Sequence, residues 1–164
     1  MTILPDVLTH DLAIVFCGSA AGHVSAARGA YYAGPGNRFW PTLAEVGLTP
    51  RQLAPEEFRL LPAFGLGLTD LCQSASGPDA ALPRTGDDPD ALDAKIRRYR
   101  PRCLAFVGKR PAKVALGRKA IVTGALPDTP YDGTRIFVLP SPSGAARRYW
   151  DIEPWRVLAR QAGR

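Results

Sequence analysis

The stretch Phe16-Cys-Gly-Ser-Ala-Ala-Gly-His23 joins an apolar run to a loop of small residues, and Val138-Leu-Pro-Ser-Pro-Ser-Gly-Ala-Ala-Arg147 repeats this arrangement. Short continuous apolar runs are typical of strands that are buried on both faces, as in a parallel sheet. Loops of small residues let the backbone approach a ligand closely. Because the clefts of open α/β sheets form at the carboxyl ends of the strands, we expect both loops at that edge.

The rest of the chain alternates strand-like and helix-like segments. Asp88 precedes Pro89, and Leu92, Ile96 and Tyr99 then share one helix face, which predicts a capped helix. The alternation predicts an α/β fold, a three-layer α/β/α sandwich with a mostly parallel central sheet of four to five strands. The expected strands are residues 12–17, 103–107, 120–122 and 136–139, and the expected helices are residues 37–46, 89–99, 111–116 and 154–161.

Length and composition favour one compact unit. The chain has 164 residues, of which 46% are hydrophobic, and this suffices for a full core. No repeat and no break in composition marks a second domain, so we expect a single domain over residues 1–164. Two segments rich in Gly, Pro and Asp, residues 73–88 and 124–133, are expected to be surface loops.

The charge balance favours a polyanionic partner. The chain has 21 Lys and Arg against 15 Asp and Glu, a net charge of +6, and its pI is about 9.6. Such a chain suits nucleic acid because neutralising phosphates releases counterions, although many solvated surfaces are also mildly basic. The positions of the arginines favour DNA as that partner. Arg147 and Arg148 follow the second small-residue loop, and Arg156, Arg160 and Arg164 would form one stripe on a helix.

Cysteines and motifs argue against several classes of protein. Cys17, Cys72 and Cys103 are isolated, and Cys17 and Cys103 lie in apolar runs where a thiol is usually buried. We therefore expect no metal, no cofactor and no disulfide framework, and the chain has no dinucleotide or P-loop motif. No apolar stretch approaches the ~20 residues that span a bilayer, and no signal-peptide pattern is present, which predicts a cytoplasmic protein without a membrane partner.

Residues 31–40, Tyr-Tyr-Ala-Gly-Pro-Gly-Asn-Arg-Phe-Trp, combine aromatic rings with a turn. Tyr32 precedes the turn, where a ring could stack on an extruded base or could simply fill the core. Asn37 is expected to cap the helix that follows, and the Phe-Trp pair to pack in the core.

The loop after the last predicted strand carries groups that suit phosphate. Prolines at positions 140 and 142 stiffen the loop. Ser143 and Gly144 offer a hydroxyl and backbone N–H donors, and Arg147 offers charge-assisted hydrogen bonds. A plain surface turn has a similar composition, so these residues alone leave both interpretations open.

Four motifs, in the same order and spacing, resemble those of mismatch-specific uracil-DNA and thymine-DNA glycosylases. Gly36-Asn-Arg-Phe-Trp40 resembles the family's A-N-R-F-W signature, and Gly67-Leu-Thr-Asp-Leu71 resembles its G-[VIL]-T-x-L strand end. Val138–Arg147 resembles the V-L-P-N-P-S-G-x-x-R loop, and Gly18-Ser-Ala-Ala-Gly22 stands where the family has G-I-N-P-G. The resemblance implies a base-flipping DNA glycosylase that hydrolyses the N-glycosidic bond of uracil and starts base excision repair.

The resemblance also implies a site and a partner. The base would be held by Gly18, Ala20, Ala21, Gly22, Tyr32, Asn37 and Ser141, and the flanking DNA by Ser143, Gly144, Ala145, Ala146, Arg147 and Arg148. The partner would be double-stranded DNA that contains uracil or mismatched bases. A monomer would bind it in the cytoplasm, where the DNA would associate the protein with the nucleoid.

The first motif departs from the family at the residue that positions the attacking water. Ala20 replaces that Asn and cannot hydrogen-bond a water molecule. Ser141 also replaces an Asn, and Ala145 is smaller than the usual apolar wedge. The family's catalytic residue therefore has no counterpart in this chain.

Three polar residues are candidates for the missing catalytic role: Asp70, His23 and Ser19. Asp70 is preferred because it lies at a strand end, and a carboxylate can bind water and offset positive charge on the sugar; an Asp there could instead cap a turn. His23 could act as a general acid, polarise the departing uracil oxygen or attack the sugar, or could lie on the surface without a role.

Two other functions are compatible with the sequence. A protein without the catalytic Asn could bind uracil or mismatched DNA without turnover, or could trap it covalently. A basic α/β domain could instead bind nucleotides or an acidic partner without flipping a base. Lys109 and Lys113 lie outside the four motifs, so a Schiff-base lyase mechanism has no clear nucleophile.

Overall fold

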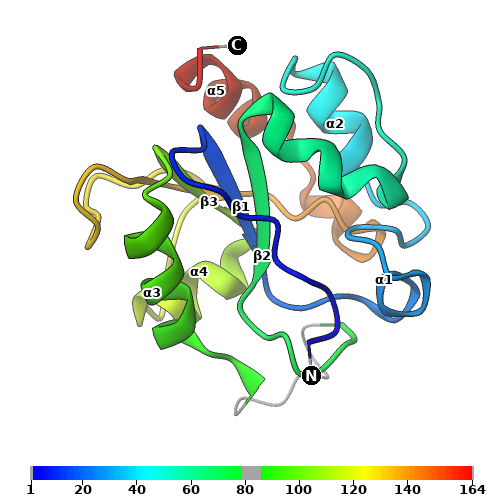
Figure 1. Cartoon of the computed structure of the whole chain (residues 1–164), viewed down its shortest axis with the longest axis horizontal. Coiled ribbons are helices and arrows are strands. Elements are labelled where there is room, and N and C mark those ends of the chain that lie inside the picture. The colour runs from blue at the N-terminus through cyan, green and yellow to red at the C-terminus, as the bar shows by residue number, and fades with distance from the viewer. Residues whose placement is uncertain (1, 79–85, 164) are drawn as a thin grey trace.

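A single mixed sheet organises the computed structural model, which describes residues 2–78 and 86–163. Its five strands have the order β2-β1-β3-β5-β4. Parallel neighbours are formed by β1 (Ile14–Gly18), β2 (Leu66–Asp70), β3 (Cys103–Val107) and β5 (Arg135–Leu139), whereas β4 (Gly124–Ala125) runs antiparallel to β5. Helices cover both faces of the sheet (Figure 1), which confirms the predicted three-layer α/β/α fold.

The central strands are continuously apolar because both of their faces are covered. Every residue of β1, β2 and β3 is buried. β1 lies between β2 and β3, and the β1–β2 register pairs Gly18 with Asp70. This pairing places the loop that follows β1 beside the end of β2.

One face of the sheet carries a large aromatic core. The Phe16 ring of β1 lies 5.2 Å from the Phe39 ring and 5.9 Å from the Trp155 ring, measured between centroids. Phe39 and Trp155 come from two different helices, so these contacts join distant parts of the chain to the central strand. The elements on this face are α1 (His23–Arg28), α2 (Phe39–Glu45), the 3-10 helix η1 (Pro55–Phe64) and α5 (Glu153–Gln161).

The opposite face is covered by α3 (Pro89–Tyr99) and α4 (Lys109–Leu116). α3 begins and ends where the sequence predicts, and the Asp88 carboxylate caps it by accepting a 3.0 Å hydrogen bond from Ala91 N–H. None of the helices in the described ranges, 2–78 and 86–163, has the length and apolar composition needed to cross a membrane.

The predicted strand at residues 120–122 is wrong. Ile121 is buried, but Val122 is 72% exposed, and this segment pairs with no strand. The edge strand β4 lies instead at residues 124–125, inside the segment expected to be a loop. One buried side chain is enough to anchor a loop to the core, so a three-residue apolar run does not specify a strand.

The other predicted helices and strands agree more closely with the structure. β3 has the predicted bounds, and the helices expected at residues 37–46, 111–116 and 154–161 are present as α2, α4 and α5 with shifted ends. The sequence analysis did not predict α1 or η1, and it identified only the end of β2. The expected loop at residues 73–88 lies in part, at residues 79–85, outside the described residues.

The N-terminal segment pairs with the outer edge of β2. Val7 and Leu68 exchange two backbone hydrogen bonds of 2.9 Å in an antiparallel bridge. This approach requires glycine at position 67, because a Cβ there would lie 2.6 Å from the Val7 carbonyl oxygen and 2.6 Å from Leu12 Cδ1. Gly67 therefore allows the N-terminal segment to lie against the sheet.

Replacing Gly67 by alanine is expected to destabilise the protein by about 1–3 kcal/mol, because the added methyl group overlaps backbone that cannot move freely. Thermal unfolding would measure this as a fall in Tm. Gly34→Ala is the control, because a Cβ at position 34 meets no atom within 4 Å. Equal Tm values for the two variants would contradict the close approach.

Candidate active site

The loops with small residues gather at one edge of the sheet. Because β1, β2, β3 and β5 are parallel, the residues that follow them lie at the same edge, as the sequence predicts. The loop after β1 contains residues 18–22, the loop after β3 begins at Gly108, and residues 140–144 follow β5. This carboxyl edge is therefore the candidate site.

Asp70 and Tyr32 meet at Gly18. A Cβ built on Gly18 would lie 2.8 Å from Asp70 Oδ1 and 3.0 Å from the Tyr32 hydroxyl oxygen. Asp70 is only 7% exposed, and its carboxylate makes no hydrogen bond with any residue in the described ranges. The sequence-based candidates Asp70, Tyr32 and Gly18 are thus brought together, and only glycine at position 18 avoids a clash with the two oxygens.

The pKa of the Asp70 carboxyl group lies close to neutral pH. Burial raises the pKa of Asp70 to about 7, the nearby Asp6 carboxylate raises it as well, and the Lys95 ammonium opposes the shift. A carboxyl group with this pKa is partly protonated at neutral pH, and such a group can accept or release a proton during a reaction.

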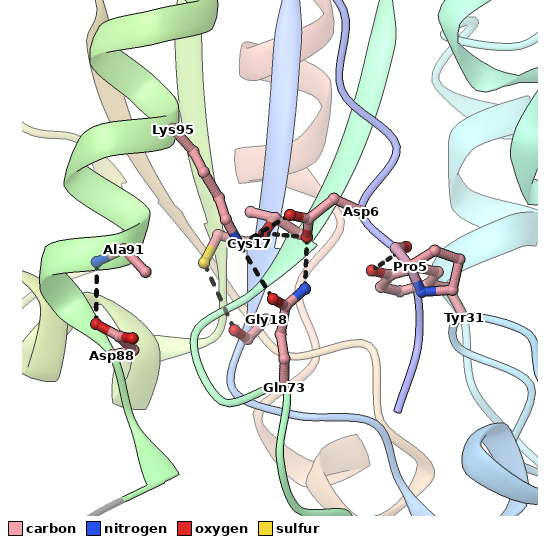
Figure 2. Close-up of polar contacts among 10 residues, drawn as sticks. Pro5, Asp6, Cys17, Gly18, Tyr31, Gln73, Asp88, Ala91 and Lys95 are labelled. Atoms are coloured by element: carbon pink, nitrogen blue, oxygen red, sulfur yellow. Dashed lines mark hydrogen bonds and ion pairs between the residues drawn. The ribbon is translucent and has the colours of Figure 1, made fainter. Parts of the chain in front are cut away.

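Four side chains from four segments form a polar network whose charged members act on Asp70. Figure 2 shows three of them, Asp6, Gln73 and Lys95. One Asp6 oxygen accepts hydrogen bonds from Thr69 Oγ1 at 2.7 Å and from Gln73 Nε2 at 2.6 Å. Lys95 Nζ lies 2.8 Å from the other Asp6 oxygen and donates to Gln73 Oε1 at 3.1 Å. The network fixes the N-terminal segment, the end of β2 and α3 relative to one another.

The sequence analysis did not identify this network. Lys95 carries a detectable signal, because it interrupts the helix face formed by Leu92, Ile96 and Tyr99. Asp6 carries none, since its partners are 63 and 67 residues away in the chain.

Tyr32 has a constrained position. Its φ is 53°, a left-handed conformation that non-glycine residues rarely adopt. Its ring stacks on Phe39 at 4.0 Å between centroids with an interplanar angle of 23°, so one face of the ring is already occupied. Its hydroxyl is buried and has no hydrogen-bond partner in the described part of the chain.

The loop after β2 packs on the loop after β1. Backbone N–H groups of Leu71, Cys72 and Gly77 donate to the carbonyls of Gly18, Ser19 and Ala21 at 2.8, 2.7 and 2.9 Å. The N–H groups of Ala20 and Ala21 make no hydrogen bond with described residues. The carbonyls of this loop are therefore engaged, while two of its donors have no partner among the described residues.

Ser19 and His23, the other catalytic candidates, are placed differently from Asp70. The Ser19 hydroxyl is buried without a partner in the described residues. His23 is exposed at the start of α1, and its ring lies beside Gly77, where a Cβ would be 3.2 Å from Cε1 and Nε2. The ring makes no hydrogen bond or ion pair within the described ranges.

The loop after β5 packs against the turn that precedes α2. Arg38 N–H donates to the Pro142 carbonyl at 2.8 Å, and a Cβ on Gly144 would lie 3.0 Å from the Pro35 carbonyl oxygen. Ser143 caps the 3-10 helix η4 (Gly144–Tyr149), since its Oγ accepts from Ala145 N–H at 3.2 Å. Residues 31–40 and residues 138–147 therefore pack against each other and form one surface.

Other predicted site residues flank that surface. Ser141 Oγ accepts from Ser143 N–H at 3.3 Å, and Ser141 Cβ lies 3.6 Å from a Cβ built on Gly108. Asn37 Oδ1 accepts from Phe39 N–H at 2.9 Å, but the N-cap of α2 is Arg38 and the helix has no side-chain capping bond, so Asn37 lies one residue before the capping position predicted for it. Asn37 and Tyr32 also line a cavity of about 370 Å³, but its lining includes neither Asp70 nor residues 18–22.

Four cations at this edge differ from those on α5 in having no carboxylate partner among the described residues. Within the described residues, no carboxylate pairs with Arg38, Lys109, Arg147 or Arg148. Arg38 instead lies over the Trp150 ring, and Arg148 over the Tyr149 ring. The start of α4, the 3-10 helix η4 and the turn before α2 therefore carry positive charge that no carboxylate of the described residues pairs with.

The predicted basic stripe on α5 is largely neutralised. Arg156 lies 3.7 Å from Glu45 and 3.5 Å from Glu153, and Arg160 lies 3.4 Å from Glu153. The end of α5 lines a cavity with Ala13 and Cys103, at the amino ends of β1 and β3, away from the candidate site. The third member of the stripe, at position 164, lies outside the described residues.

Comparison with known proteins agrees with this geometry. A family model of the uracil DNA glycosylase superfamily matches residues 5–160. The structure is also similar to the solution NMR structure of a candidate uracil DNA glycosylase from Methanosarcina acetivorans, with a TM-score of 0.66 and 21% sequence identity over 98% of this chain and 97% of that one. The family match spans the buried carboxylate and all three loops, and the chain belongs to the uracil DNA glycosylase superfamily.

Proposed function

We propose that this protein is a monofunctional uracil-DNA glycosylase that uses water as its second substrate. The observation that carries the proposal is Asp70, a buried carboxyl group with a pKa of about 7 beside Gly18 at the carboxyl edge of the sheet. Superfamily membership supports the class of reaction. Uracil as the base, and a preference for uracil opposite guanine, belong to the proposal.

In the proposed reaction, Asp70 acts on both the nucleophile and the sugar. When the bond between C1′ and uracil N1 breaks, the electron pair stays on the base and the sugar becomes positive. Ionised Asp70 would offset that positive charge and accept one proton from the water molecule whose oxygen bonds to C1′. The products are the uracil anion and an abasic site with a hydroxyl group on C1′.

The loop after β1 would stabilise the departing base. Backbone donors that are fixed before the reaction stabilise a developing negative charge at no cost in reorganisation. The N–H groups of Ala20 and Ala21 are free of other partners in the described residues and belong to the loop beside Asp70. We assign them to a uracil oxygen, a role that needs no side chain at position 20.

The unpaired cations would hold the DNA backbone. Arg147 and Arg148 lie on η4, whose residues are all at least partly exposed, and Lys109 follows Gly108 at the same edge. Phosphate contacts fix the position of a protein on DNA, and flipping costs least at a mismatched base. This arrangement supports double-stranded DNA with uracil in a mismatch as the substrate.

Ala20 favours a second candidate function. Without a polar side chain at position 20, the protein could bind an extruded uracil through its loops and cations but hydrolyse it slowly. A covalent adduct at His23 would be the trapping form of this function. The two candidates differ in whether free uracil is released.

The proposed function is tested with labelled duplexes that contain uracil opposite guanine, uracil opposite adenine or thymine opposite guanine. Under single-turnover conditions, we expect an alkali-labile site to form fastest with uracil opposite guanine, because that base is the easiest of the three to extrude. A denaturing gel after alkali treatment measures the product. Selective retention without cleavage would support the binding protein, and an adduct that is lost in His23→Ala would support the trap.

Asp70→Asn is expected to lower the single-turnover rate about 100-fold, because the amide cannot accept the proton. In the unmodified protein, the rate should rise with pH and level off above about 7, since Asp70 must be ionised to act as a base. The variant should lose this dependence. Asp88→Asn is the control, because Asn caps α3 equally well. An unchanged rate in Asp70→Asn would show that the water is activated elsewhere.

The DNA surface is tested by two double variants that remove the same charge. Replacing Arg147 and Arg148 by alanine should make the slope of log affinity against log salt concentration shallower by roughly 1–2, since up to two phosphate contacts are lost. Replacing Arg156 and Arg160 by alanine should leave the slope nearly unchanged. Fluorescence anisotropy on a uracil-containing duplex measures both, and equal slopes would contradict the assignment.

A further inference from the structure

The hydroxyl group of Tyr32 is an unusual feature of the protein interior. It is buried and has no hydrogen-bond partner in residues 2–78 and 86–163. A buried hydroxyl without a partner destabilises a fold, and native proteins retain few such groups. Tyr31 shows the ordinary arrangement, because its hydroxyl donates to the Pro5 carbonyl at 2.9 Å.

Tyr32 is held in place by its surroundings. Its backbone keeps the left-handed φ of 53°, and its ring stacks on Phe39. Strained conformations of this kind persist where neighbouring contacts fix them, and they occur often at functional sites. The packing therefore holds the hydroxyl close to Gly18.

That place is shared with Asp70. The Tyr32 hydroxyl oxygen and Asp70 Oδ1 both lie within 3.0 Å of the position that a Cβ on Gly18 would occupy. A side chain at position 18 would collide with both oxygens, so both converge on this glycine. The two oxygens make no hydrogen bond with each other, and neither has a hydrogen-bond partner among the described residues.

We propose that the Tyr32 hydroxyl and the Asp70 carboxylate together hold the attacking water molecule over Gly18. This inference rests on the proposed function and names the residue that replaces the positioning role lost at Ala20. The water would accept a hydrogen bond from Tyr32 O–H and donate one to Asp70, which leaves a lone pair of the water oxygen for C1′. Fixing the nucleophile at two points orients it before the reaction begins.

Proton and electron balance is kept in this arrangement. The water oxygen bonds to C1′, one of its protons passes to Asp70, and the electron pair of the broken bond stays on uracil N1. Tyr32 keeps its proton throughout. Burial, and next the charge of Asp70, raise the pKa of Tyr32 well above its ordinary value, so the phenol remains a hydrogen-bond donor.

The test compares Tyr32→Phe with Tyr31→Phe, two neighbouring variants that each lose one hydroxyl group. Tyr32→Phe keeps the ring and any stacking on the base, so the single-turnover rate should fall about tenfold or more while Tm changes little. Its affinity for a duplex with non-cleavable 2′-fluoro-deoxyuridine should stay within about twofold of the original. Tyr31→Phe should show the reverse, a lower Tm with the original rate.

An unchanged rate in Tyr32→Phe would overturn the inference, and so would a loss of rate matched by an equal loss of affinity. A crystal structure of the free protein gives a readout that does not need activity: a water molecule within hydrogen-bond distance of Tyr32 Oη and Asp70 supports the inference, and its absence contradicts it. If the unmodified protein cleaves no uracil duplex, the proposed function fails, and the crystal structure still decides whether the two oxygens hold water.

Discussion

A carboxyl group that the fold keeps away from water is the constraint on which the site depends. Asp70 ends β2 in a buried position, where it has no hydrogen-bond partner among the described residues. Its pKa lies above that of an exposed carboxyl group, so ionising it in the folded state is unfavourable. By linkage, this group makes the protein less stable as pH rises from about 4 to 7. A group that lowers stability in this way is typical of a reactive site.

Much of the surrounding structure sets the environment of that carboxyl group. The register of β1 and β2 puts Gly18 beside Asp70, and Gly67 lets the N-terminal segment reach the same strand. Asp6 lies on that segment and is bonded to Thr69, Gln73 and Lys95. The network therefore places one negative and one positive charge near Asp70, which act on its pKa in opposite directions.

The cations of the surface differ in whether a carboxylate pairs with them. Arg38, Lys109, Arg147 and Arg148 at the carboxyl edge have no carboxylate partner in the described residues, and neither do Arg102 and Arg135 at the amino ends of β3 and β5. Arg156 and Arg160 of α5 are paired with glutamates. Net charge alone does not distinguish these two groups of arginines. Only the unpaired group can neutralise phosphate without first giving up an ion pair.

The sequence by itself determined the fold class, the strand at residues 103–107 and the helix with its Asp88 cap, because apolar periodicity and capping are local properties. It also made Asp70 and Tyr32 candidates for the site. The prediction of a strand at residues 120–122 was wrong, because a short apolar run with one buried side chain has the same sequence pattern as a short strand. Only the tertiary structure decided that Asp70 and the Tyr32 hydroxyl meet over Gly18, that Asp6 and Lys95 lie nearby, and that the arginines of α5 are neutralised. These facts depend on strand register and on contacts between residues far apart in the chain, which no local pattern encodes.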